Sequence, residues 1–78
     1  TMPRRLALVI GNVAYERNEL QHCVNDATEI AKTLHKIGYK ETLHLNLRSD
    51  QMYDHIKKFT KSIESGDFVI FFFAGHGV

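Results

Sequence analysis

The chain is poor in cysteine, in long apolar runs and in charge of one sign, and each scarcity excludes a class of protein. One cysteine among 78 residues excludes an internal disulfide framework and fits a reducing compartment, so a cytoplasmic location is expected. No apolar stretch approaches the roughly 18 residues that a membrane-spanning helix requires. The formal net charge is +1, without a long run of either sign. Neither nucleic acid nor a membrane is therefore expected as a partner.

Two motifs that bind nucleotides are also missing. The sequence contains neither G-x-G-x-x-G nor the lysine motif of a P-loop. Gly11-Asn12, after the first apolar segment, is the only support for a flavodoxin- or Rossmann-type ligand-binding module, which is the weaker alternative. No internal repeat or low-complexity segment is present, and no metal site or other cofactor is predicted.

Three apolar segments predict β-strands, at residues 4–10, 41–47 and 68–72. The first and third are apolar almost throughout, which is typical of strands covered on both faces of a parallel sheet. The second alternates leucine with polar residues, so one of its faces is expected to meet water.

The first segment with helical periodicity is residues 25–37. Its apolar residues recur at i, i+3, i+4 and i+7, which predicts one buried stripe: Ala27, Ile30, Ala31, Leu34 and Ile37. Asp26 or Asn25 is the candidate N-cap, and Gly38 is expected to end the helix.

A second helix is expected at residues 50–64, with Ser49 as candidate N-cap and Gly66 after its end. Its stripe consists of Met52, Ile56, Phe59 and Ile63. Residues 11–24 are expected to form a long loop.

The order β-α-β-α-β predicts an α/β fold with a parallel sheet, right-handed crossovers and helices on both faces. The alternating second strand belongs at an outer position, which gives the strand order 2-1-3. The third strand would then be an open edge rich in phenylalanine, an aggregation hazard unless another strand covers it. The sheet is therefore expected to continue beyond Val78, and the chain to be the first part of a larger domain.

The most informative residue is His76, which lies between Gly75 and Gly77 at the end of the third strand. Ligands of open α/β sheets bind at the carboxyl ends of the strands, and glycine neighbours allow a substrate backbone to approach closely. His76 is therefore a candidate general base and acid, and the N–H of Gly77 can stabilise an oxyanion. The alternatives are a histidine bonded to a backbone carbonyl and a glycine that only serves a turn.

Asp26 and Cys23 are expected near the same edge. Asp26 can cap a helix and also present a carboxylate to a ligand, because a cap uses one oxygen. Cys23 and His76 suggest a nucleophile pair, but a small apolar residue often packs at a helix entrance, and this is the preferred interpretation of Cys23. The remaining histidines are expected to be solvated: His22, His35, His44 and His55.

Three segments resemble the start of the caspase-like p20 domain of peptidase clan C14. Leu6 to Asn12 reads L-A-L-V-I-G-N, Cys23 to Ala27 reads C-V-N-D-A, and Phe72 to Gly77 reads F-F-A-G-H-G. They occur in the expected order and cover nearly the whole chain. The variant is similar to a metacaspase, a paracaspase or a bacterial-type member.

The resemblance implies a cysteine endopeptidase with a Cys–His dyad, in which His76 is the catalytic histidine and Gly77 contributes to the oxyanion hole. The nucleophilic cysteine of such proteins follows the histidine by ~50 residues, so Cys23 does not occupy its position. Residues 1–78 would then be the N-terminal part of a p20 catalytic domain, inactive without the rest of that domain. Peptides or proteins would be its substrates, and these residues do not decide whether calcium activates it.

The resemblance also bears on specificity. Members that cleave after aspartate carry an arginine shortly before the helix, where Leu20 is the nearest position here and Arg17 is close by. Members that cleave after arginine or lysine hold the basic side chain with an aspartate that Asp26 matches. Cleavage after Arg or Lys is therefore expected. A non-catalytic scaffold of the same family is the main alternative, and the sequence after Val78 would decide between them.

Overall fold

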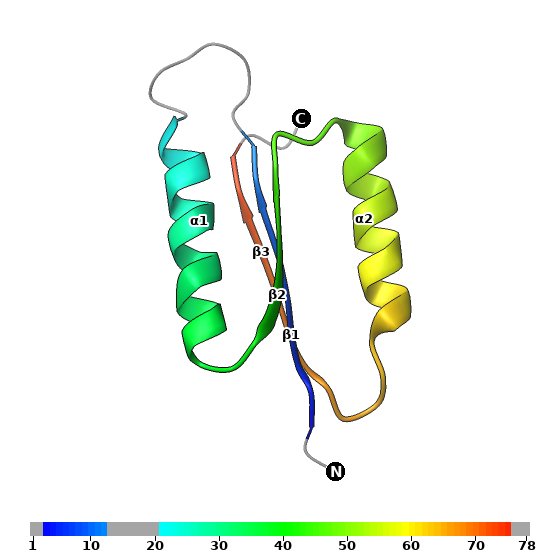
Figure 1. Cartoon of the computed structure of the whole chain (residues 1–78). Helices are drawn as coiled ribbons and strands as arrows, with labels where there is room; N and C mark the ends of the chain where they lie inside the picture. The colour runs from blue at the N-terminus through cyan, green and yellow to red at the C-terminus, as the bar shows by residue number, and fades with distance from the viewer. Residues whose placement is uncertain (1–2, 13–20, 76–78) are drawn as a thin grey trace.

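The computed structural model describes residues 3–12 and 21–75 of the chain (Figure 1). Within these residues the elements are β1 (Arg5–Gly11), α1 (Gln21–Lys36), β2 (Lys40–Leu45), α2 (Ser49–Ser62) and β3 (Phe68–Ala74). The predicted order of strands and helices is confirmed.

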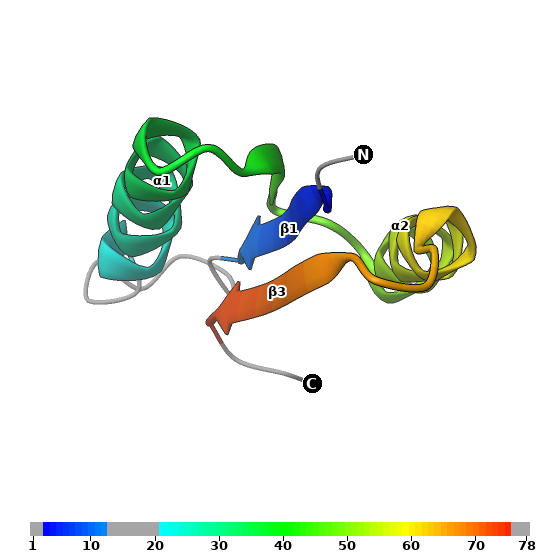
Figure 2. The same ribbon diagram turned by 90° about the horizontal axis from the view of Figure 1, so that it is seen from below.

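The three strands form one parallel sheet in the order β2-β1-β3. The two helices lie on opposite faces of this sheet, as Figures 1 and 2 show. Each crossover therefore carries its helix to a different side. The predicted α/β fold, the strand order 2-1-3 and the placement of helices on both faces are confirmed.

The central strand, β1, is the most deeply buried element. Leu8, Val9 and Ile10 have exposed fractions of 1%, 0% and 0%, because strands flank β1 on both sides and a helix lies over each face. Burying an aliphatic side chain of this size stabilises a fold by about 1.5–3 kcal/mol. Every residue of the uninterrupted apolar run in β1 is thus buried.

On one face of the sheet, α1 packs against Ala7 and Val9 through a stripe of buried residues, Ala27, Ala31 and Leu34. The predicted stripe is confirmed for these three residues, with Ile30 partly buried beside them. Ile37 does not belong to it: it follows the end of α1 and is 53% exposed. Gly38 adopts a positive φ of 95° immediately afterwards, as a residue that ends a helix does.

The start of α2 differs from the prediction. Ser49 is the first helical residue, and Arg48 occupies the N-cap position with extended backbone. The N–H of Arg48 donates to Oε1 of Gln51 at 2.9 Å. A glutamine three residues into the segment therefore supplies the capping contact that we had expected from Ser49.

On the other face of the sheet, α2 packs less tightly, and none of its residues is buried. The contact includes two histidines, His44 of β2 and His55 of α2, whose ring centroids lie 3.7 Å apart at an interplanar angle of 33°. Both residues are half-buried. The expectation that they would be solvated is therefore wrong, because a contact between distant elements covers them.

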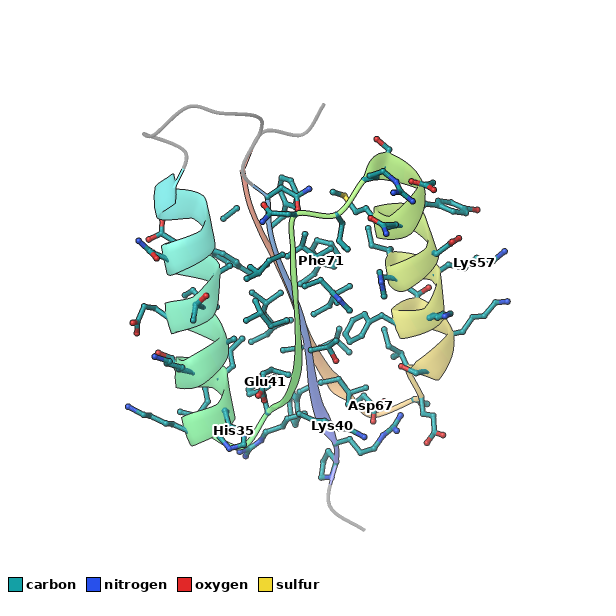
Figure 3. The ribbon with its side chains drawn as sticks, turned by 45° about the horizontal axis from the view of Figure 1, so that its top comes forward. His35, Lys40, Glu41, Lys57, Asp67 and Phe71 are labelled. Atoms are coloured by element: carbon teal, nitrogen blue, oxygen red, sulfur yellow. The ribbon has the colours of Figure 1, made fainter. Side chains whose placement is uncertain are left out.

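β3 is an edge strand in the part of the chain that the structure describes, since it pairs with β1 alone. Phe68, Val69 and Phe71 are 56%, 40% and 47% exposed, and Figure 3 shows Phe71 among the side chains between the sheet and α2. The expected open edge is thus present. The expectation that both faces of the third strand would be covered is not met.

An ion pair ties the start of β1 to the connection between α2 and β3. Nε of Arg4 donates to Oδ1 of Asp67 at 3.1 Å, and an Nη2 hydrogen donates to Oδ2 at 2.6 Å. The same guanidinium reaches the carbonyl of Ser62, and Asp67 also accepts from the N–H of Glu64 at 2.8 Å. The hydrogen bond from Arg4 lowers the pKa of the Asp67 carboxyl below its usual value.

Neither helix in the described part of the chain is both long and apolar enough to cross a membrane.

Acidification should weaken the contact between α2 and the sheet. Burial, and secondly the neighbouring His55, lower the pKa of His44. The folded state thus disfavours protonation of His44. Its contribution to stability is full above the ordinary histidine pKa of ~6.5 and is lost as the pH falls through the lowered value.

The melting temperature should therefore fall between about pH 7.5 and pH 5, and His44→Gln should reduce this slope. His35→Gln is the control for the removal of a histidine outside the stacked pair: His35 is exposed, and its Nδ1 lies 3.2 Å from Oε2 of Glu41. Equal slopes for the wild type and His44→Gln in thermal unfolding experiments would contradict the assignment.

Candidate functional site

The carboxyl ends of the three strands meet at one edge of the sheet. In the strand register, Gly11 at the end of β1 lies opposite Leu45 of β2 and Ala74 of β3. The start of α1 lies at the same end of the molecule (Figure 1). Since ligands of open α/β sheets bind at this edge, it is the candidate site.

Asn12, directly after β1, is hydrogen-bonded to the end of β3 and to the segment that follows β2. Its N–H donates to the carbonyl of Ala74 at 2.9 Å. Its side chain accepts the N–H of Leu47 at Oδ1, 2.9 Å away, and donates from Nδ2 to the carbonyl of Leu47, 3.2 Å away. Asn12 is only 9% exposed, so little water competes for these bonds.

The chain leaves β2 through a left-handed residue. Asn46 has φ of 58°, a conformation that asparagine tolerates better than most residues. Its N–H donates to the carbonyl of Gly11 at 2.9 Å. The predicted second strand therefore ends at Leu45 rather than Leu47, and residues 46–48 pass over the end of β1.

Gly75 lies against Asn12 so closely that no side chain fits. It has φ of 135°, a conformation that essentially only glycine adopts. A Cβ atom at this position would overlap the carbonyl oxygen of Asn12 and approach its carbonyl carbon and Cβ to 3.2 and 3.3 Å. The glycine before His76 is thus required by a close contact between the residues that directly follow β3 and β1.

His76 and Gly77, the predicted catalytic residues, lie outside the described residues. The structure places the residue before them, Gly75, at the carboxyl edge. Because His76 lies outside the described residues, its proximity to Asp26 and Cys23 stays a prediction.

Asp26 is an exposed residue in the second turn of α1. Because α1 begins at Gln21, four residues before Asn25, neither Asn25 nor Asp26 caps the helix, and that prediction is wrong. Ala27 is fully buried against the sheet, and successive residues of a helix are separated by ~100°. Asp26 therefore flanks the buried stripe.

Cys23 belongs to the first turn of α1 and not to the expected loop. The predicted loop extends to residue 24 because neither a capping residue nor apolar periodicity marks the start of the helix at Gln21. The cysteine is thus part of the helix that covers one face of the sheet.

The residue whose contacts were not predicted is Asn12, which was assigned to a loop, to the ligand-binding alternative and to the segment L-A-L-V-I-G-N, but to no role in connecting the strand ends. An amide side chain directly after a buried strand and a glycine was the available signal. Its partners, Leu47 and Ala74, are far away in the sequence, so no local pattern of residues indicates that Asn12 contacts them.

No group of three or more His, Cys, Asp or Glu side chains that could hold a metal ion occurs among residues 3–12 and 21–75. A pocket of about 360 Å³, whose lining includes Arg5, Lys40 and Phe68, opens at the other end of the sheet. Figure 3 shows Lys40 and Asp67 at that end. The pocket is therefore separate from the carboxyl edge.

Replacing Gly75 by alanine should disrupt the carboxyl edge. Both Gly75→Ala and the control Gly66→Ala place a Cβ at positive φ, where strain costs about 1–3 kcal/mol. Only Gly75→Ala also meets backbone atoms, since nothing lies within 4 Å of a Cβ at Gly66. Thermal unfolding should show a larger loss of stability for Gly75→Ala than for Gly66→Ala. Equal losses of stability would refute the close contact.

Comparison with known proteins places the chain in a family. The family model of the caspase domain, peptidase family C14, matches residues 4–78. No curated protein and no solved structure shows significant similarity to the chain. The match covers every strand and helix described above and extends through the G-H-G segment after β3. The chain therefore belongs to the caspase domain family of cysteine peptidases.

Proposed function

We propose that the chain is the N-terminal part of the catalytic domain of a cysteine endopeptidase that acts in the cytoplasm. The observation that carries this proposal is the position of the G-H-G segment. It follows the strand whose end is held against Asn12 at the carboxyl edge, and the family match extends through it. Peptides or proteins are the substrates, and the rest of the domain supplies the nucleophile.

His76 acts as the general base and acid in the proposed reaction. It accepts the thiol proton of a cysteine from the rest of the domain, and the thiolate attacks the carbonyl carbon of the scissile peptide bond. The N–H of Gly77 stabilises the resulting oxyanion. His76 then protonates the amine as the C–N bond breaks, and water hydrolyses the thioester to a carboxylate and the free thiol.

Cys23 is not the nucleophile in this proposal. The first turn of α1 contains it, and α1 follows the first strand, whereas the cysteine of the caspase signature follows the histidine by ~50 residues. The nucleophile therefore comes from beyond Val78.

Asp26 is the proposed acceptor for a basic side chain of the substrate. Asp26 is exposed and lies beside the buried stripe of α1. It is near the start of this helix, the end that lies at the carboxyl edge of the sheet. A carboxylate pairs with a guanidinium through two parallel N–H···O bonds. Substrates are thus expected to carry Arg or Lys immediately before the cleaved bond.

Replacing His76 in the intact protein should abolish turnover. His76→Ala removes the proton acceptor and donor, and kcat/KM for a fluorogenic peptide should fall by about 10³-fold or more. His35→Ala is the control, because His35 is an exposed residue at the other end of α1. Cleavage by a folded His76→Ala variant at the wild-type rate would end the catalytic assignment.

Replacing Asp26 should change specificity more than turnover. For Asp26→Asn, kcat/KM for peptides with Arg before the cleaved bond should fall by roughly 10²-fold, since an ion pair of 2–3 kcal/mol is lost. Glu29→Gln, an exposed change one turn further along α1, should leave the preference unaltered. An unchanged ratio of Arg to uncharged substrates in Asp26→Asn would exclude Asp26 from the pocket.

A further inference from the structure

We propose that Asn12 is a positioning residue for His76: it fixes the direction in which the chain leaves β3 and connects that segment to residues 46–48. The inference rests on the proposed function, because it assigns Asn12 a role toward the catalytic histidine. Asn12 itself touches neither substrate nor a reacting atom in this proposal.

The first support is the number of independent bonds that meet at Asn12. One backbone hydrogen bond goes to Ala74 of β3, and two side-chain hydrogen bonds go to the N–H and C=O of Leu47. A single residue thus connects the strand before His76 with the segment that leads into α2. Each bond restricts a different part of Asn12, so the backbone and the amide plane are both held.

The second support is the contact between Asn12 and Gly75. The backbone of Gly75 packs on the carbonyl group of Asn12 without space for a Cβ. The bond from the Asn12 N–H fixes Ala74, the preceding residue, at 2.9 Å. Two successive residues of the segment that leads to His76 are therefore in contact with Asn12.

The third support is the chemistry of the side chain. Leu47 presents one donor and one acceptor to the same side chain, and a primary amide satisfies both at once. A carboxylate can accept from the N–H but has no hydrogen to donate to the carbonyl. Among the described residues, no buried side-chain nitrogen or oxygen lacks a partner, and both the Nδ2 and the Oδ1 of Asn12 are hydrogen-bonded to Leu47.

The experiment separates positioning from stability in the intact protein. Asn12→Ala removes both side-chain bonds, and Asn12→Asp keeps the acceptor for the Leu47 N–H while losing the donor. Leu34→Ala is the matched control: Leu34 is 7% exposed in the packing of α1, so its loss destabilises the fold away from the Asn12 contacts.

All variants are assayed at a temperature at which circular dichroism shows them folded. We expect kcat to fall by about 10²-fold for Asn12→Ala, by a smaller factor for Asn12→Asp, and not at all for Leu34→Ala, with little change in KM. The ring signals of His76 in NMR spectra should shift in both Asn12 variants and stay unchanged in Leu34→Ala.

The outcomes distinguish this proposal from the proposed function. If His76→Ala is inactive while folded Asn12→Ala and Asn12→Asp keep the wild-type kcat and His76 signals, positioning by Asn12 is overturned and the catalytic assignment stands. If His76→Ala stays active, the catalytic assignment falls, and with it the role of Asn12 in the reaction. A loss of kcat in Leu34→Ala equal to that in Asn12→Ala would also overturn the proposal, since stability alone would explain it.

Discussion

The burial of β1 is the constraint on which the rest of the structure depends. Its apolar side chains alternate between the two faces of the sheet. The same strand therefore provides an apolar surface for α1 on one face and for α2 on the other. Hydrogen bonds to β2 and β3 hold it on both sides. The register of β2 and β3 with β1 consequently determines where these two strands end. The carboxyl edge is an extension of this packing, because Asn12 is simply the first residue after the buried run.

Periodicity in the sequence was sufficient to predict the order of elements and the arrangement of the sheet. The unbroken run of β1 and the alternation in β2 reflect how many faces are covered, which is why the strand order could be inferred. The stripe of Ala27, Ala31 and Leu34 was predictable for the same reason, since burial of one helix face leaves a regular trace.

The features that could not be predicted depend on contacts between distant segments, or on helix starts that the sequence marks only weakly. Nothing in the sequence marks the start of α1 at Gln21, and the cap of α2 comes from Gln51 rather than from a hydroxyl residue. The stacking of His44 on His55 and the bonds of Asn12 to Leu47 join residues whose proximity only the folded chain creates. The carboxyl edge was predicted as the candidate site, whereas the hydrogen bonds that Asn12 makes there were not predicted.

The two polar junctions have a mechanical consequence. Arg4 and Asp67 fasten β3 to β1 at one end, and Asn12 and Ala74 fasten it at the other. A force that slides β1 along its neighbours would load all of these hydrogen bonds simultaneously, so they would have to break together. A force that peels β3 away from β1, starting at one end of the strand, would break them one after another. The fold should therefore be much stiffer to pulling along the strands than to pulling across them.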